Sequence, residues 1–204
     1  LFSKGDLIVH LQTSLYEMVV GYLLAVIIGI PLGIIMGWYQ TVEYSLDPFV
    51  WFLYSAPLIA FYPLFIVWLG LGIPTVIALT LLLTVFPIIV NTITGVKNVN
   101  PILLRSARAF GASDFVLFLR VVIPSALPII IAGLRLGAGR AMIGVIIGEF
   151  FGATKGIGYF ISYSGARLRM DELFFGLFLT VIIGVSLTQG LKFMETKISR
   201  WRTE

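Results

Sequence analysis

The sequence predicts an all-α membrane protein, a polytopic bundle of transmembrane helices. Of its 204 residues, 59% are hydrophobic and only 12% are charged, and the mean hydropathy is +1.03. A soluble domain of this length could not bury so much apolar surface. The apolar residues form continuous runs interrupted by single Gly and Pro residues, whereas transmembrane strands alternate polar and apolar residues. We therefore expect residues 1–204 to form one helical membrane domain.

Five apolar runs reach the roughly 20 residues that a helix needs to cross a bilayer. They cover residues 18–38, 49–69, 74–96, 126–150 and 173–191. In the first run a small residue recurs at every fourth position, as Gly21, Ala25, Gly29, Gly33 and Gly37. Small residues let helix backbones approach closely in a membrane, so this stripe predicts helix packing. A shorter stripe in the fourth run, at Gly133, Gly137 and Ala141, fits either packing or a close crossing beside a transport pathway.

The positions of the basic residues predict which ends of these spans face the cytoplasm. One group lies in a long polar interruption, at Lys97, Arg105, Arg108 and Arg120. A second group lies in the C-terminal tail, at Lys192, Lys197, Arg200 and Arg202. With five spans the interruption and the tail fall on one side, and the positive-inside rule makes that side cytoplasmic. Residues 40–47 then form a cytoplasmic loop without a cation, and the opposite side receives Lys4, Lys155, Arg167 and Arg169.

The polar interruption, residues 97–125, begins with the signals of a short helix. Asn100 and Pro101 favour a helix start, because Asn caps free N–H groups and Pro fits the first turn. Gly111 favours a helix end, since glycine enters the left-handed conformation at little cost.

A second short helix follows this first one. Ser113 and Asp114 provide its N-terminal cap, and Pro124 and Pro128 mark the entry into the next span. A helix–Gly–helix element beside membrane spans predicts a rigid contact site for a partner in the adjacent aqueous phase.

This interruption resembles the EAA loop in permease subunits of type I ATP-binding-cassette (ABC) importers. The matching residues are Arg105-Ser106-Ala107, then Gly111, then Ile123-Pro124. The family usually has glutamate where this chain has Arg105, so any contact that needs a negative charge there is absent. The resemblance extends to HLQTSL at residues 10–15 and GEFFGATKGIGYFI at residues 148–161. Among these importers, the chain most resembles the nitrate, sulfonate and taurine branch.

The resemblance implies a type I importer permease fold with six spans, so that one further helix would precede the five visible here. It implies two permease copies (this chain twice, or with a similar chain), two cytoplasmic ATPase subunits and an extracytoplasmic solute-binding protein. The ATPase subunits would use ATP and Mg, and this chain would bind no cofactor itself. Its place would be the bacterial cytoplasmic (inner) membrane, as a multi-pass protein in contact with lipid.

The resemblance also assigns a role to the interruption, which would contain the cytoplasmic coupling helix that docks on the ATPase. The residues assigned to that contact are Arg105, Ser106, Ala107, Arg108, Phe110, Gly111, Ala112, Ser113, Asp114 and Pro124.

Two arginines stand out within the fourth span. A cation on a membrane helix costs roughly 2.5–3.5 kcal/mol on insertion scales, so it usually faces protein, water or a partner. Arg135 is close enough to the cytoplasmic face to snorkel, whereas Arg140 lies near mid-span. Arg140 either lines the pathway and meets an anion, or pairs structurally with backbone carbonyls or with Glu149, about 13 Å away along the helix.

Further pathway candidates come from the other spans. Tyr54, Ser55 and Tyr62 lie around Pro57, which predicts a broken or kinked helix that faces a cavity. Asn91 is polar near the end of the third span, where hydrogen bonding between helices is the favoured interpretation. The candidates for the pathway are Tyr54, Ser55, Tyr62, Asn91, Arg140 and Glu149.

Catalytic and metal chemistry find no support in the sequence. The chain has no Cys and one histidine, His10, which we expect to lie outside the membrane, so metal sites and Ser–His triads lack ligands or bases. No G-x-x-x-x-G-K-[ST] phosphate loop occurs. The net charge of +4 reflects cations beside membrane spans and does not indicate nucleic-acid binding. If transport is active, its energy must come from another polypeptide.

The expected function is therefore that of a permease subunit, with a small anion or zwitterion as the solute. A heteroaromatic vitamin precursor is the alternative solute, because aromatic residues cluster around the second span. An ion-coupled transporter or channel is the alternative class. Such proteins commonly need intramembrane carboxylates, and none lies between Met18 and Gly148 except those in loops. An intramembrane enzyme would need a nucleophile–base pair that the sequence does not offer.

Overall fold

The computed structural model describes residues 4–198, and every regular element in this range is helical. The α-helices are α1 (Lys4–Trp38), α2 (Gln40–Ser55), α3 (Tyr62–Leu69), α4 (Ile73–Lys97), α5 (Pro101–Ala109), α6 (Asp114–Leu117), α7 (Ile123–Gly152), α8 (Ile157–Ala166) and α9 (Met170–Ile198). A 3-10 helix, η1 (Leu58–Phe61), precedes α3, and a π-helical turn, η2 (Phe118–Val122), joins α6 to α7. Arg200 and Arg202 lie outside the described residues, as do the side chains of Lys4 and Lys197.

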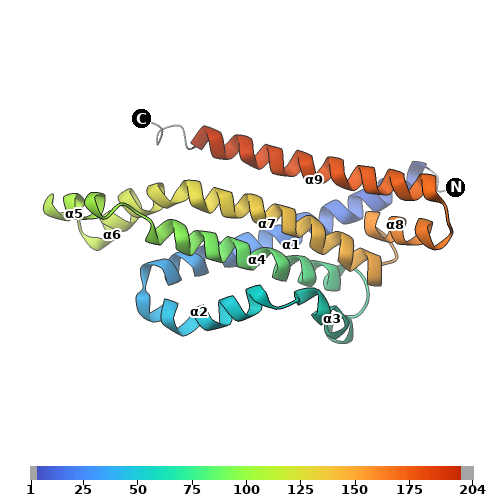
Figure 1. The fold of residues 1–204 in the computed structure, drawn as a ribbon, viewed down its shortest axis with the longest axis horizontal. Coiled ribbons are helices and arrows are strands. Elements are labelled where there is room, and N and C mark those ends of the chain that lie inside the picture. Colours follow the sequence, from blue (N-terminus) through green and yellow to red (C-terminus); the bar gives the residue numbers. More distant parts are fainter. Residues whose placement is uncertain (1–3, 199–204) are drawn as a thin grey trace.

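The long helices run along one common axis (Figure 1). The short helices α5 and α6 lie at the same end of this axis as the C-terminal end of α9, and α8 lies at the opposite end with the start of α1. The chain passes along the axis five times. The polar interruption and the described C-terminal end of α9 thus lie at one end of the bundle, as predicted.

Four of the five predicted spans are single long helices, contained in α1, α4, α7 and α9. The second pass is different, because Gln40–Ser55 and Leu58–Leu69 meet at an angle of 86°. The break lies at Pro57, as expected, and the residue before it, Ala56, is extended with φ −67° and ψ 145°. Proline lacks an N–H group and disfavours the helical conformation in the residue before it. Residues 49–69 thus form a broken helix, as Pro57 predicted, and are the fifth candidate span if the bent pair is taken as one.

One predicted loop is also helical. Residues 40–47, expected to form a loop, are the first turns of α2. A short connection joins α7, which ends at Gly152, to α8, which begins at Ile157. The sequence analysis missed α8 altogether, since its ten residues are too few to produce a clear periodic signal.

Helix α4 forms the centre of the bundle and packs along both α1 and α7. The glycine stripe of α1 lies directly on α4, where Gly21, Gly29, Gly33 and Gly37 face Thr80, Ile88, Thr92 and Val96. On the other side, Gly133, Gly137, Gly144 and Gly148 of α7 face Asn91, Ile88, Thr80 and Val76. The packing interpretation of the first stripe is thus confirmed, and the second stripe is also a close helix crossing.

Gly33→Ala tests this contact. A Cβ atom at residue 33 would lie 2.6 Å from Cβ of Thr92 and 2.9 Å from the carbonyl oxygen of Ile89, so α1 and α4 must separate. Overpacking of this kind costs about 1–3 kcal/mol, and we expect a Tm several degrees lower in detergent. Gly139→Ala is the matched control, because its Cβ would meet nothing within 4 Å. Equal Tm values for the two variants would contradict the close contact.

Candidate functional site

The candidate coupling element, residues 97–125, begins with a well-capped helix. The side chain of Asn100 accepts a hydrogen bond from the N–H of Ile102 at 2.9 Å, and Pro101 occupies the first turn of α5. The side chain of Ser113 caps α6 in the same way, by accepting from the N–H of Val116 at 3.4 Å. Both predicted helix starts are confirmed.

Helix α5 ends in a Schellman motif. Gly111 has φ +79°, its N–H donates to the carbonyl of Arg108 at 2.9 Å, and the N–H of Ala112 donates to that of Ala107 at 3.1 Å. These bonds satisfy carbonyl groups that a helix end leaves free. The predicted role of Gly111 as a helix end is confirmed.

The candidate coupling element has an inner and an outer face. Leu104 and Ala107 pack on the apolar cluster that contains Leu117 and Val122. Phe110 points away from the bundle and is 91% exposed. Among the other predicted contact residues, those exposed are Arg105, Ser106, Arg108, Gly111, Ser113 and Asp114, while Ala112 and Pro124 are half-buried.

Charge contributes little to the rigidity of this element. Arg108 and Asp114 form an ion pair at 3.5 Å, but their side chains are 63% and 81% exposed. Exposed pairs of this kind contribute about 0–1 kcal/mol. The shape of the element therefore depends on its caps and on its apolar inner face.

Pro124 lies in the first turn of α7, as predicted, and neither it nor Pro128 breaks the helical path. The helical path runs over 39 residues, Asp114–Gly152, through both of them. The π-helical turn η2 directly precedes Pro124. Proline in a helix clashes with the carbonyl group four residues earlier, and a π-turn is a common way for a helix to absorb such an irregularity. As a result, α6, η2 and α7 form one continuous rod.

The end of α1 also contacts this rod. A cavity of about 370 Å³ lies between them, lined by Ile34, Ile35, Trp38, Tyr39, Asp114, Phe115 and Phe118. The rings of Trp38 and Phe118 meet edge to face at 5.2 Å. Movement of α6 would therefore reach α1 as well as α7.

The two arginines of α7 have different surroundings. Arg135 forms an ion pair with Glu195 of α9 at 2.9 Å, so it has a partner within the chain. Arg140 is exposed, and within residues 4–198 neither Glu149 nor any other acid forms an ion pair with it. The structural alternative of an Arg140–Glu149 pair is therefore wrong.

Glu149 belongs to a buried polar network at the opposite end of the bundle from α5. One carboxylate oxygen accepts from the hydroxyl of Ser14 at 2.5 Å, and the other accepts from the N–H of Gly158 at 2.7 Å. Ser14 Oγ accepts from the N–H of Ile157 at 2.8 Å, and His10 Nδ1 accepts from the N–H of Gly156 at 3.0 Å. Side chains of α1 and α7 thus cap the free N–H groups of α8.

The sequence analysis missed the part of this network that lies on α1. His10 is buried in α1, as are Ser14 and Glu17. Glu17 lies beside Glu149, and its carboxylate oxygens have no hydrogen-bond donor among the described residues. His10, Ser14 and Glu17 are spaced four and three residues apart, which places them on one face of the helix. This spacing is the sequence signal from which a polar face of α1 could have been predicted.

The remaining pathway candidates do not form one site within this chain. The hydroxyl of Tyr62 is buried and donates to the carbonyl of Gly148 at 2.7 Å. The amide of Asn91 donates to the carbonyl of Pro87 at 2.8 Å, within α4 itself and not between helices as expected, and its Cβ packs at Gly133 of α7. Tyr54 and Ser55 are exposed at the end of α2.

Comparison with known proteins decides the family. Residues 29–201 match the family described as the inner membrane component of binding-protein-dependent transport systems. The chain belongs to this family. It is 33% identical over 203 residues to the taurine transport system permease protein of Escherichia coli, covering 100% of this chain and 74% of that protein. A Bacillus subtilis permease protein named for aliphatic sulfonates is 32% identical, covering 99% of this chain and 73% of that protein.

A third relative is the formylaminopyrimidine transport permease protein of Halalkalibacterium halodurans, 33% identical over 98% of this chain and 80% of that protein. The fold is similar to a chain of the inward-facing MetNI methionine ABC transporter, with a TM-score of 0.83 and 18% identity over 97% of this chain and 99% of that one. The protein is thus a type I ABC importer permease subunit. It is not an enzyme, since a separate subunit hydrolyses ATP in these systems.

Gly111→Val tests the candidate coupling element. Left-handed geometry costs a non-glycine residue about 1–2 kcal/mol, and a β-branched residue tolerates it poorly. We expect the end of α5 to be misplaced and solute uptake to fall by about tenfold, since about 1.4 kcal/mol corresponds to that factor. Gly111→Asn is the control, because Asn tolerates this conformation. Normal uptake by a normally expressed Gly111→Val transporter would refute the coupling role.

Ser14→Ala tests the network that caps α8. The change leaves the buried N–H of Ile157 without its acceptor and Glu149 without one donor, at a cost of about 1–3 kcal/mol. Hydrogen exchange of the amides of residues 156–158 should accelerate by about tenfold or more. Thr13→Ala is the control, because the hydroxyl of Thr13 is exposed and bonds only the carbonyl of Val9 in its own helix. Equal exchange in the two variants would show that Ser14 does not hold α8.

Proposed function

We propose that this permease carries a small organic anion or zwitterion, such as a sulfonate or taurine, and that Arg140 attracts its negative group. The observation that supports this is the difference between the arginines of α7. Arg135 has an acidic partner in Glu195, whereas Arg140 is exposed and has no ion pair within the described residues. A cation that is costly near mid-span needs a compensating group, and an anionic solute would supply it.

The physical advantage of this position is its low dielectric constant. Coulomb attraction at a given distance is several times stronger there than in water, although desolvation offsets part of the gain. The guanidinium group also offers paired donors that match the oxygens of a sulfonate or carboxylate. Relatives named for taurine and for aliphatic sulfonates agree with this class of solute.

We further propose that the pathway lies between two copies of this chain, as a homodimer in the bacterial cytoplasmic membrane. Helix α7 exposes Leu136, Arg140 and Ile143 at spacings of four and three residues, so they lie on one face. A face that combines large apolar residues with a single cation suits a subunit interface that encloses a solute. A solute-binding protein would deliver the solute at the end opposite α5.

The continuous rod supports a coupling mechanism that we propose as part of this function. Two cytoplasmic ATPase subunits, using ATP and Mg, would each hold one candidate coupling element on its exposed outer face. ATP binding would bring the ATPase subunits together and push on α5 and α6. Because α6, η2 and α7 are continuous, the push moves Arg140 as part of a rigid body, in the manner of other domain rotations. Hydrolysis would return the rod and reopen the pathway inward.

A heteroaromatic solute is the second candidate. Trp51 and Tyr54 are exposed on α2 with their rings edge to face at 5.8 Å, and the Halalkalibacterium halodurans relative is named for a formylaminopyrimidine. Flat heteroaromatic rings stack well on such side chains. This candidate requires no contact with Arg140.

Arg140→Gln distinguishes the two solute classes. The substitution keeps hydrogen-bonding capacity and removes the charge, so uptake of taurine by the complete reconstituted transporter should fall by about 10- to 100-fold. Hydrogen bonds to charged groups contribute roughly 1.5–3 kcal/mol, and each 1.4 kcal/mol is a factor of ten. Basal ATPase activity should persist, and Arg140→Lys should retain part of the uptake.

Two results would contradict this proposal. Unchanged taurine uptake by Arg140→Gln would make Arg140 a structural residue. Uptake of a formylaminopyrimidine that is lost in Tyr54→Ala but kept in Arg140→Gln would establish the aromatic alternative.

A further inference from the structure

We propose that Leu168, in the turn between α8 and α9, is the apolar anchor onto which the solute-binding protein docks. This inference rests on the proposed function, because it names the contact through which the delivering partner engages the permease. The turn lies at the far end of the bundle from α5 (Figure 1). It directly precedes Met170, the first residue of the α9 span.

The backbone of Leu168 is unusual. Among residues 4–198 it is the only non-glycine residue with a positive φ, +56°. Its surroundings repeat the Schellman motif of Gly111. The N–H of Leu168 donates to the carbonyl of Gly165 at 3.1 Å, and the N–H of Arg169 donates to that of Ser164 at 3.0 Å. Glycine would fit this position without strain.

Packing of the Leu168 side chain within this chain does not account for its strained backbone. It is 76% exposed, so it stabilises no internal packing that would offset the unfavourable backbone. Strained residues persist where the surroundings impose them, and they concentrate at functional sites. A leucine held outward in this way presents a rigid apolar knob at the tip of the molecule.

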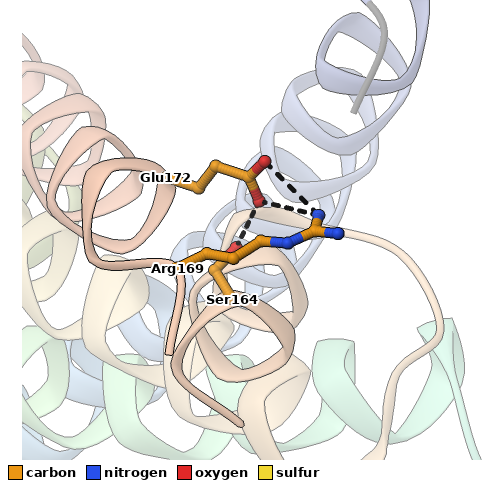
Figure 2. Close-up of polar contacts among 3 residues, drawn as sticks. All are labelled: Ser164, Arg169 and Glu172. Atoms are coloured by element: carbon orange, nitrogen blue, oxygen red, sulfur yellow. Dashed lines mark hydrogen bonds and ion pairs between the residues drawn. The ribbon is translucent and has the colours of Figure 1, made fainter. Parts of the chain in front are cut away.

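The residues on either side of Leu168 are held in place by polar contacts. Arg169 forms an ion pair with Glu172 at 3.4 Å, and Glu172 accepts from the hydroxyl of Ser164 at 3.2 Å (Figure 2). The guanidinium carbon of Arg167 lies 3.5 Å from the ring centroid of Tyr163. The leucine is thus flanked by two fixed side chains, and because Glu172 already pairs with Arg169, Arg167 is the cation that suits a carboxylate at the rim of an apolar hollow on the partner.

Contact at Leu168 would reach the transport pathway through α8. The N-terminal end of α8 is held by His10, Ser14 and Glu149, and Glu149 belongs to α7, the helix that carries Arg140. A docked partner that pushes or pulls on the turn therefore acts on the same rod as the ATPase, from its other end.

A binding protein is favoured over lipid as the occupant for two reasons. The turn combines Leu168 with the charged residues Arg167, Arg169, Asp171 and Glu172, a mixture that suits a wet protein surface. The family itself is described as dependent on a binding protein. The lipid alternative becomes an outcome of the test.

The test is Leu168→Gly in the complete transporter, which should change two quantities in opposite directions. Relief of backbone strain should raise the Tm of the permease by about 2–4 °C, the shift expected per kcal/mol for a chain of this size. Loss of the anchor should raise, by about tenfold or more, the concentration of taurine-loaded solute-binding protein that half-maximally stimulates the ATPase. Basal ATPase activity should not change. Leu168→Asn, which tolerates the same backbone, should show the same loss of stimulation.

Each other outcome overturns the inference. An unchanged half-maximal concentration in Leu168→Gly, with normal stimulation of the parent, would overturn the anchor and leave the proposed function intact. A defect seen in lipid nanodiscs but not in detergent would show that Leu168 acts through the membrane. Failure of the parent transporter to respond to any taurine-loaded binding protein would overturn the proposed function, and the anchor with it.

Discussion

The close contact of α4 with α1 and α7 is the constraint on which the rest of the structure depends. Lipid supplies no hydrophobic drive for helix association, so helices in a membrane must gain contact through tight packing. Glycines on both neighbours bring their backbones against the side chains of α4, with Gly33 on Thr92 and Gly144 on Thr80. This packing fixes α1 and α7 side by side and allows His10, Ser14 and Glu149 to cap α8 together.

The continuous helical path from Asp114 to Gly152 connects the two ends of the bundle. One end of this rod carries the exposed Phe110 and the capped helix α5, and the other ends in the buried network around Glu149. Arg140 lies between them, with no acid to pair with it in the described part of the chain. Under the proposed mechanism the rod moves as a body, and events on either side of the membrane would act on the same arginine.

Two turns at opposite ends of the bundle use the same backbone motif with different residues. Gly111 has the residue type that the left-handed conformation favours, and the adjacent Phe110 presents the apolar surface. At the other end Leu168 occupies the left-handed position itself and is also the exposed apolar residue. The first arrangement is unstrained and the second is strained, and the proposed docking contact would account for an exposed leucine at that position.

The sequence by itself determined the features that depend on neighbouring residues. Long apolar runs predicted four spans, Asn100 and Ser113 predicted helix starts, and Gly111 predicted a helix end. These signals depend only on residues that are close together in the sequence. Only the tertiary structure decided which distant side chains meet. Nothing local indicates that Arg135 would find Glu195, or that Ser14 would join residues more than 130 positions away. The burial of His10 and Glu17 likewise depends on how α1, α7 and α8 come together, and a single sequence carries no direct record of those long-range contacts.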